Sequence, residues 1–293
     1  MGAINIIILV ILALVLLWGL NNVFFKTNII YDKMCEASKV PKTSITPGDT
    51  VSSTNVIVSK DIPETTSSNF TLSVWFYIDN WGNNISKEKN ILYMANSPAS
   101  TTATGLSSVT GISTKVTLIS QAATTVAVAR HKNINIALDK YENNLFIDIE
   151  CFQDKIEADG AERTIYTRYK IPNISVQKWN NLTLSVDNRT LDVYLDGKLR
   201  NSFILHGLYK NYYDSVTPKH IYLGNMLTYN PSNVGFEGFI TRIRYIPESS
   251  NPQDAYNYYK EGINASLASS LFNKYSLKVS FLEYNKEKGS IQI

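Results

Sequence analysis

The sequence predicts an all-β protein: a β-sandwich with one short helix, in a single domain. Apolar and polar residues alternate in three short runs between Trp179 and Leu199, the period-two pattern of half-buried strands. Asp187–Thr190 and Asp196–Gly197 separate these runs, and such residues favour tight hairpin turns because Asp, Asn and Gly tolerate positive φ. A chain of 293 residues with 44% hydrophobic content can bury a core of this size.

Other segments have the same character. Further strands are predicted at residues 56–58, 70–78, 115–120, 126–130, 133–138, 144–152, 165–171, 220–225, 236–246 and 276–284. Residues 97–113 are mostly Ser, Thr, Ala and Gly, which predicts a long loop.

The short helix is predicted to begin after Asn251. Asn251 is a favourable N-cap, Pro252 suits the first helical position, and Asp254 complements the positive end of the helix dipole. Gly262 is expected to end the helix.

Several blocks in order carry a family resemblance. They are "FTLSVWFYI" from Phe70, "LTLSVD" and "LDVYLDGKL" from Leu182 to Leu199, "IYLGN" from Ile221, and "GFEGFITRIRY" from Gly235. Over residues 56–284 the chain resembles the laminin-G/concanavalin A-like lectin and glucanase superfamily. The resemblance implies a concanavalin A-like jelly-roll sandwich, a fold that hosts lectins, glycosidases and structural modules. It also implies that the last strand, residues 276–284, pairs near the first.

The amino terminus predicts a membrane anchor in residues 1–22. The apolar run from Ile4 to Leu20 includes Leu9, Leu14 and Trp18 and is long enough to span hydrocarbon as a helix. A cleaved signal peptide and a buried helix are the alternatives, but no basic residue precedes the run and no small-residue cleavage site follows it. Residues 23–55 are interpreted as a linker, and residues 56–293 as the sandwich.

Two signals disagree about which side of the membrane the sandwich occupies. Lys26, Lys33, Lys39 and Lys42 follow the apolar run, which by the positive-inside rule favours the cytosolic side. Six glycosylation sequons favour the opposite side; they begin at Asn69, Asn84, Asn173, Asn181, Asn188 and Asn264. A chain rich in Asn, Ser and Thr, however, produces such sequons by chance. We favour the cytosolic side, and the two cysteines, Cys35 and Cys151, are expected to be free thiols.

One strand offers a catalytic hypothesis. Glucanases of the superfamily carry Glu-x-Asp-x-Glu on a strand, and retaining hydrolysis needs two carboxyl groups on one face. The corresponding stretch here has Phe146 in place of the first Glu, followed by Asp148 and Glu150. We therefore expect no catalytic residue, and interpret Asp148 and Glu150 as the solvated face of an alternating strand.

Metal and nucleic-acid chemistry have little support. Asp79 and Asp187 are weak calcium candidates, because members of the superfamily bind Ca²⁺ through loop carboxylates, but both lie in turn-like sequences where Asp is common. No other cofactor is indicated. The net charge of +3 gives no reason to expect nucleic-acid binding.

Contacts with a glycan or a protein partner are expected from aromatic residues in loops. Exposed aromatic rings stack on sugars, and Tyr is also enriched at protein interfaces. The candidates are Trp81, Tyr209, Tyr212, Tyr213 and Tyr229.

These features together suggest a non-catalytic, membrane-anchored structural protein. The layout is similar to that of laminin-G-like virion components of large icosahedral DNA viruses, which implies a minor capsid or virion membrane-associated role linking an inner membrane to a protein shell. The expected partners are the lipid bilayer and other proteins of a capsid-like assembly, with the sandwich facing the capsid on the cytosolic side. A membrane-anchored lectin and a glucanase-type glycoside hydrolase are the alternatives.

Overall fold

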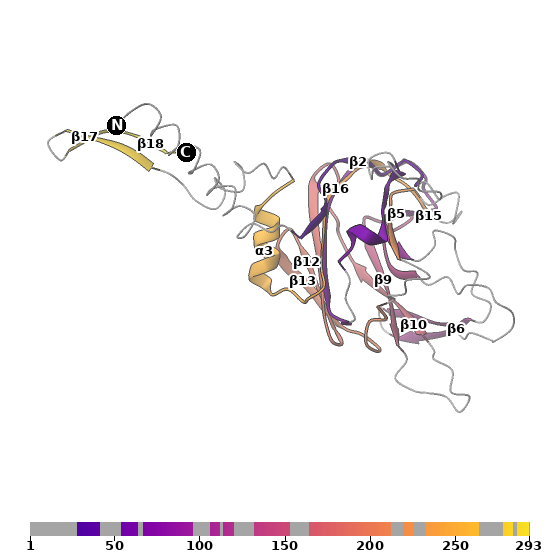
Figure 1. Ribbon diagram of the computed structural model, residues 1–293. Coiled ribbons are helices and arrows are strands. Elements are labelled where there is room, and N and C mark those ends of the chain that lie inside the picture. The colour runs from indigo at the N-terminus through magenta and orange to yellow at the C-terminus, as the bar shows by residue number, and fades with distance from the viewer. Residues whose placement is uncertain are drawn as a thin grey trace.

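Two β-sheets pack face to face in the computed structural model of the chain (Figure 1). The structure describes residues 28–41, 54–63, 67–95, 106–111, 114–119, 132–152, 164–211, 219–225, 233–263, 278–283 and 286–292. Within these ranges the protein is almost entirely β, with the single α-helix α3 (Pro252–Lys260) and a short 3-10 helix, η1 (Ser59–Asp61).

Seven described strands form the first sheet, which we call sheet A. Its order is β1-β16-β4-β11-β12-β13, with β2 also pairing with β16. The bounds are β1 Ile29–Tyr31, β2 Cys35–Glu36, β4 Phe70–Asn80, β11 Trp179–Asp187, β12 Thr190–Leu195, β13 Lys198–Ile204 and β16 Glu237–Ile246.

Nine described strands form the second sheet, sheet B. Its order is β3-β14-β5-β8-β9-β10-β7-β6, and β15 pairs with β5 in parallel. The bounds are β3 Val56–Ile57, β5 Glu88–Ala95, β6 Leu106–Gly111, β7 Thr114–Ile119, β8 Lys132–Leu138, β9 Leu145–Phe152, β10 Thr164–Ile171, β14 His220–Leu223 and β15 Asn233–Val234.

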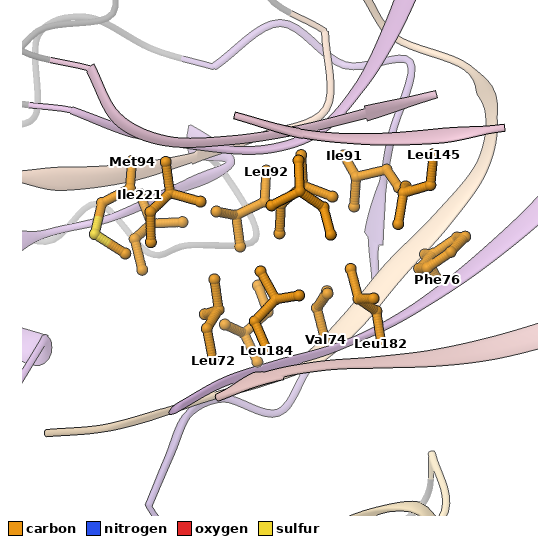
Figure 2. Close-up of a cluster of buried hydrophobic side chains, with 14 of the residues drawn as sticks. Leu72, Val74, Phe76, Ile91, Leu92, Met94, Leu145, Leu182, Leu184 and Ile221 are labelled. Carbon is orange, nitrogen blue, oxygen red and sulfur yellow. The ribbon is translucent and has the colours of Figure 1, made fainter. Parts of the chain in front are cut away.

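The core lies between the sheets and follows from the alternation in the sequence. In Figure 2, Leu72, Val74, Leu182 and Leu184 point from sheet A toward sheet B. The facing side chains from sheet B include Leu92, Met94, Leu145 and Ile221. Because successive strand residues point to opposite faces, the intervening residues lie on the outer faces.

The predicted meander is confirmed as β11, β12 and β13. Positive φ values of 51° at Asp196 and 72° at Gly197 form the second turn, as the Asp-Gly pair indicated. The face opposite the core is polar, as expected, but much of it is buried: Thr183 hydrogen bonds to Ser73, and Ser185 to Ser250 at the start of α3.

Helix α3 lies against the outer face of sheet A, beside β12 and β13 (Figure 1). Its predicted N-cap is confirmed, because the Asn251 side chain accepts a hydrogen bond from the Asp254 N–H and the Asp254 carboxylate accepts one from the Asn251 N–H. The ring of Tyr259 stacks on Trp75 of β4, with 5.7 Å between ring centroids.

Three expectations were wrong: one about the linker, one about a loop and one about the pairing of the last strand. Strands β1 and β2, which fall in the segment interpreted as a linker, pair with β16 and belong to sheet A. Part of the predicted 97–113 loop is strand β6, which pairs with β7. The last strand, β17 (Lys278–Glu283), pairs with β18 (Lys286–Gln292) and not near the first strand.

Candidate functional site

Strand β9 places Asp148 and Glu150 on the outer face of sheet B. Ile147 and Ile149 alternate with them and fill the core. The sequence suggested that the two carboxylates are solvated, but Asp148 is 5% exposed and Glu150 is fully buried. That expectation was wrong, because the flanking strands β8 and β10 bring other side chains over this part of the face.

Arg168 binds Asp148 through two parallel hydrogen bonds. The register places Arg168 of β10 directly opposite Asp148. Its Nε donates to Asp148 Oδ1 at 2.6 Å, and its Nη2 donates to Asp148 Oδ2 at 2.9 Å. This fork-shaped pairing is the strongest arrangement that a guanidinium and a carboxylate can make.

Two more side chains complete this charged cluster, which we define as Glu88, Asn135, Asp148 and Arg168. Arg168 donates from Nη1 to Glu88 Oε1 at 2.6 Å, and the Asn135 amide donates to Asp148 Oδ2 at 3.0 Å. Burial alone would lower the pKa of Arg168, but the hydrogen bonds and charges of Asp148 and then Glu88 raise it above its ordinary value. The cluster therefore joins β5, β8, β9 and β10 with a permanent positive charge at its centre.

This geometry is poorly suited to glycoside hydrolysis. A retaining mechanism needs one carboxylate free to attack and another able to donate a proton. Both oxygens of Asp148 already accept hydrogen bonds from Arg168. At the position that corresponds to the first Glu of the glucanase motif, the centre of the Phe146 ring lies 4.8 Å from the Arg168 guanidinium carbon, and the ring packs against the cluster. The chemistry that the arrangement supports is cross-strand charge pairing.

Tyr209 is not a surface contact residue. Its side chain is fully buried, its ring centroid lies 4.6 Å from that of Phe70, and its hydroxyl lies 3.9 Å from Met94 Sδ. Burial also raises its pKa well above the ordinary value for tyrosine. The prediction of a loop contact was wrong because the isolated bridge between Tyr209 and Cys151 draws this segment into the core.

The other predicted contact residues are only partly described. Trp81 is half-buried and packs against the core, and the ammonium of Lys89 lies 5.0 Å from the centre of its ring. One face of the indole is therefore already occupied. Tyr212, Tyr213 and Tyr229 lie outside the described residues.

The two calcium candidates lie far apart. Asp187 follows Val186, which is opposite Phe70 at the start of β4, whereas Asp79 is near the end of β4. Nine residues of strand separate the two positions, about 30 Å at 3.3 Å per residue. Among the described residues no group of three or more His, Cys, Asp or Glu is placed to hold a metal ion.

The predicted anchor, including Ile4, Leu9, Leu14 and Trp18, lies outside the described residues. Within the described ranges, no helix has the length and apolar character to cross a bilayer. Cys35 and Cys151 form no disulfide, as predicted. Both are buried, and burial raises the pKa of the Cys35 thiol to about 12.

The sequence interpretation missed Arg168, Glu88 and Asn135. Asn135 and Arg168 lie in the predicted strands 133–138 and 165–171, whereas no strand was predicted over Glu88, which begins β5. Their meeting depends on strand register, and no tight turn fixes the register between β9 and β10, which are separated by residues 153–163.

Comparison with known proteins gives no family assignment. No protein-family model matches the chain, and no curated protein matches it either. The structurally similar proteins include the binding domain of botulinum neurotoxin serotype D, with 13% identity over 71% of this chain and 40% of that chain, and a TM-score of 0.41. A ligand-binding domain of the same serotype in complex with N-acetylneuraminic acid is 12% identical, covers 71% of this chain and 39% of that one, and has a TM-score of 0.40.

The receptor binding domain of botulinum neurotoxin type G is also similar, with 13% identity, 66% and 38% coverage, and a TM-score of 0.36. The chain thus matches about two-fifths of the length of each of these structures. Similarity at this level assigns neither a ligand nor an activity to the chain.

Proposed function

We propose that this chain is a non-catalytic binding and structural protein. The observation that carries the proposal is the pairing of Asp148 with Arg168 in the charged cluster. The strand that resembles the catalytic strand of glucanases has lost its first acid to Phe146, and its second acid is engaged in a structural ion pair. We therefore expect the sandwich to act by binding other molecules at its surface.

We also propose a fold family for the sandwich. The sandwich is a laminin-G/concanavalin A-like jelly roll, as the order of the sequence blocks from Phe70 to Tyr245 suggests. Two facing sheets with a short helix after β16 are consistent with that assignment.

The cellular role that fits is a membrane-anchored component of a virion, joining an inner membrane to a protein shell. The apolar run from Ile4 to Leu20 supports the anchor, and the lysines that follow it support a cytosolic, capsid-facing sandwich. The loops of the sandwich would then contact shell proteins.

Three measurements on the full chain test the proposal. We expect no turnover of β-glucans, resistance of the chain to alkaline carbonate extraction from membranes, and its recovery in purified particles. Hydrolysis that is lost in the Glu150→Gln variant would establish an enzyme and contradict the proposal. Selective binding on a glycan array, with no recovery in particles, would favour a membrane-anchored lectin instead.

A further inference from the structure

The sandwich begins almost immediately after the predicted anchor. The Asn28 carbonyl accepts a hydrogen bond from the Tyr245 N–H at 3.2 Å, and Ile29 pairs with Arg244. Only residues 23–27 separate Asn28 from the anchor of residues 1–22. Five extended residues span at most about 18 Å, at 3.3–3.6 Å each. If the anchor spans a bilayer, the edge of sheet A at β1 must lie close to that bilayer.

A row of aromatic side chains lies on the outer face of the same sheet. Tyr77 of β4 is opposite Phe239 of β16 on one side and opposite Trp179 of β11 on the other. Residues paired in this way point to the same face, and the neighbours Phe76 and Ile78 point into the core, so the row Phe239, Tyr77 and Trp179 faces outward. The Tyr77 and Trp179 rings touch, with centroids 5.5 Å apart.

This aromatic row remains partly open to solvent. Phe239 is 37% exposed, and Tyr77 and Trp179 are half-buried. Trp75, two residues earlier on β4, is covered by the ring of Tyr259 from α3. Helix α3 therefore covers the neighbouring part of the face and leaves the row uncovered. Met34, 49% exposed and next to the inward-facing Cys35 of β2, adds an apolar side chain at this edge.

Aromatic side chains of this type favour the boundary between hydrocarbon and water. Trp and Tyr are enriched at the headgroup level of membranes, where an apolar ring and a polar group are both accommodated. Adjacent exposed apolar side chains on a soluble domain mark an interaction surface. The short connection of residues 23–27 keeps the edge of sheet A, and with it this surface, within reach of the bilayer. The outer face of sheet B is not held near the bilayer in this way.

We propose that the aromatic row and Met34 rest in the headgroup layer of the bilayer that holds the anchor. The inference rests on the membrane anchor of the proposed function and adds an orientation: the outer face of sheet A lies against the lipid, and sheet B points away from it. The surface of sheet B would then be the one that remains available to partner proteins.

The test uses the full chain in phosphatidylcholine vesicles. One variant carries Phe239→Cys, and a second carries Met34→Cys and keeps the aromatic row. The new cysteine of each variant is labelled with a thiol-reactive, environment-sensitive dye. Tyr141→Cys is the matched control, because Tyr141 is highly exposed in the turn between β8 and β9 of sheet B. The native Cys35 and Cys151 are buried, and the unsubstituted chain measures their background labelling.

We expect spin-labelled lipids to remove about half of the emission at positions 239 and 34 and little at position 141, as for groups at headgroup depth. Carbonate extraction of the same vesicles reports the anchor separately. If the chain resists extraction but the labels at 239 and 34 are not quenched, the anchor would be supported and the docking of sheet A on the bilayer would be overturned. An extractable chain would overturn both. Labels that lipid does not quench, but that assembled particles shield, would assign the row to a protein partner and also overturn lipid docking.

Discussion

Arg242 of β16 and Glu261 at the end of α3 form an ion pair of 2.7 Å in which the arginine is 3% exposed. Arg242 sits at a bulge in β16, with a φ of 47°, and Arg244 donates to the same Glu261 oxygen at 2.6 Å. Asp32, just after β1, lies 3.9 Å from Arg242. The Glu261 carboxylate thus pairs with two buried guanidinium groups, with Asp32 supplying a second negative charge nearby, and joins the helix to the sheet.

Replacing Glu261 with Gln should therefore destabilise the sandwich. The substitution keeps the shape of the side chain but leaves two buried cations with much less compensation, and we expect a loss of about 2 kcal/mol in the free energy of unfolding, since Glu261 is itself partly exposed. Chemical denaturation followed by circular dichroism measures this. Glu248→Gln, at an exposed position, is the control, and equal losses in the two variants would refute the role of the pair.

The stack of Trp75 on Tyr259 should be the main apolar attachment of α3. Trp75 is buried beneath the helix, so Trp75→Ala removes a large ring from a packed interface and should cost about 3–5 kcal/mol. Tyr256→Ala changes an exposed tyrosine of the same helix and should cost less than about 1 kcal/mol. Similar thermal midpoints for the two variants would show that α3 is held in another way.

Local signals in the sequence were sufficient for some elements. The Asp196–Gly197 turn and the Asn251 N-cap depend on residues a few positions apart, and the structure has both as predicted. Strand β1 was missed because Ile29–Tyr31 has only three residues, and its partner β16 lies more than 200 positions later in the chain.

The candidate site depended on information that local patterns do not contain. Asp148 and Arg168 are both recognisable as strand residues, but their pairing requires the register between β9 and β10. Tyr209 lies between predicted strands, which indicated a loop, and its burial is decided by packing on Phe70. Sequence patterns thus predicted the sandwich more fully than the contacts on its surfaces.

The charged cluster leads to a double-mutant prediction. Arg168→Leu leaves the Asp148 carboxylate buried without its cation and should cost about 3 kcal/mol, whereas the Asp148→Leu/Arg168→Leu double variant should recover much of that loss. Unfolding in urea measures the four stabilities of the cycle. Additive losses, with no coupling, would mean that the pair contributes nothing beyond its separate side chains.

Lys219 makes stability depend on pH in the alkaline range. It is 5% exposed, its ammonium donates to the Asn211 amide oxygen at 2.6 Å, and burial lowers its pKa from 10.5 to about 8. Between these two values the unfolded chain holds the proton and the folded chain does not, so this lysine makes stability rise with pH. Below about pH 8 both states are protonated, and the burial penalty is present in full.

Lys219→Met removes the charge and should therefore stabilise the protein at pH 7. The fall in the pKa from 10.5 to about 8, at about 1.4 kcal/mol for each pH unit, sets an upper limit of about 3–4 kcal/mol, less the contribution of the lost hydrogen bond to Asn211. The advantage over the unsubstituted chain should shrink as the pH rises from 8 toward 10. Denaturation midpoints of both proteins at several pH values test this, and a difference that does not change with pH would be contrary to the prediction.

The position at which the sandwich starts can be tested by truncation. A version of the chain that begins at Asn28 keeps β1 and β2, whereas one that begins at Thr50 loses both and exposes the edge of β16. The version that begins at Thr50 also loses the buried side chains of Tyr31 and Cys35, and the Glu36 carbonyl that accepts a hydrogen bond from the Asn55 side-chain amide at 2.9 Å.

We expect the version that begins at Asn28 to melt cooperatively with β-type circular dichroism. The version that begins at Thr50 should be less stable by at least about 3 kcal/mol, because two buried side chains and an edge of the sheet are lost. An unpaired β16 should also promote aggregation, since a free strand edge can pair with another chain. Equal melting temperatures and equal solubility would mean that residues 28–36 are dispensable to the sandwich, and the short tether that places sheet A beside the membrane would no longer follow.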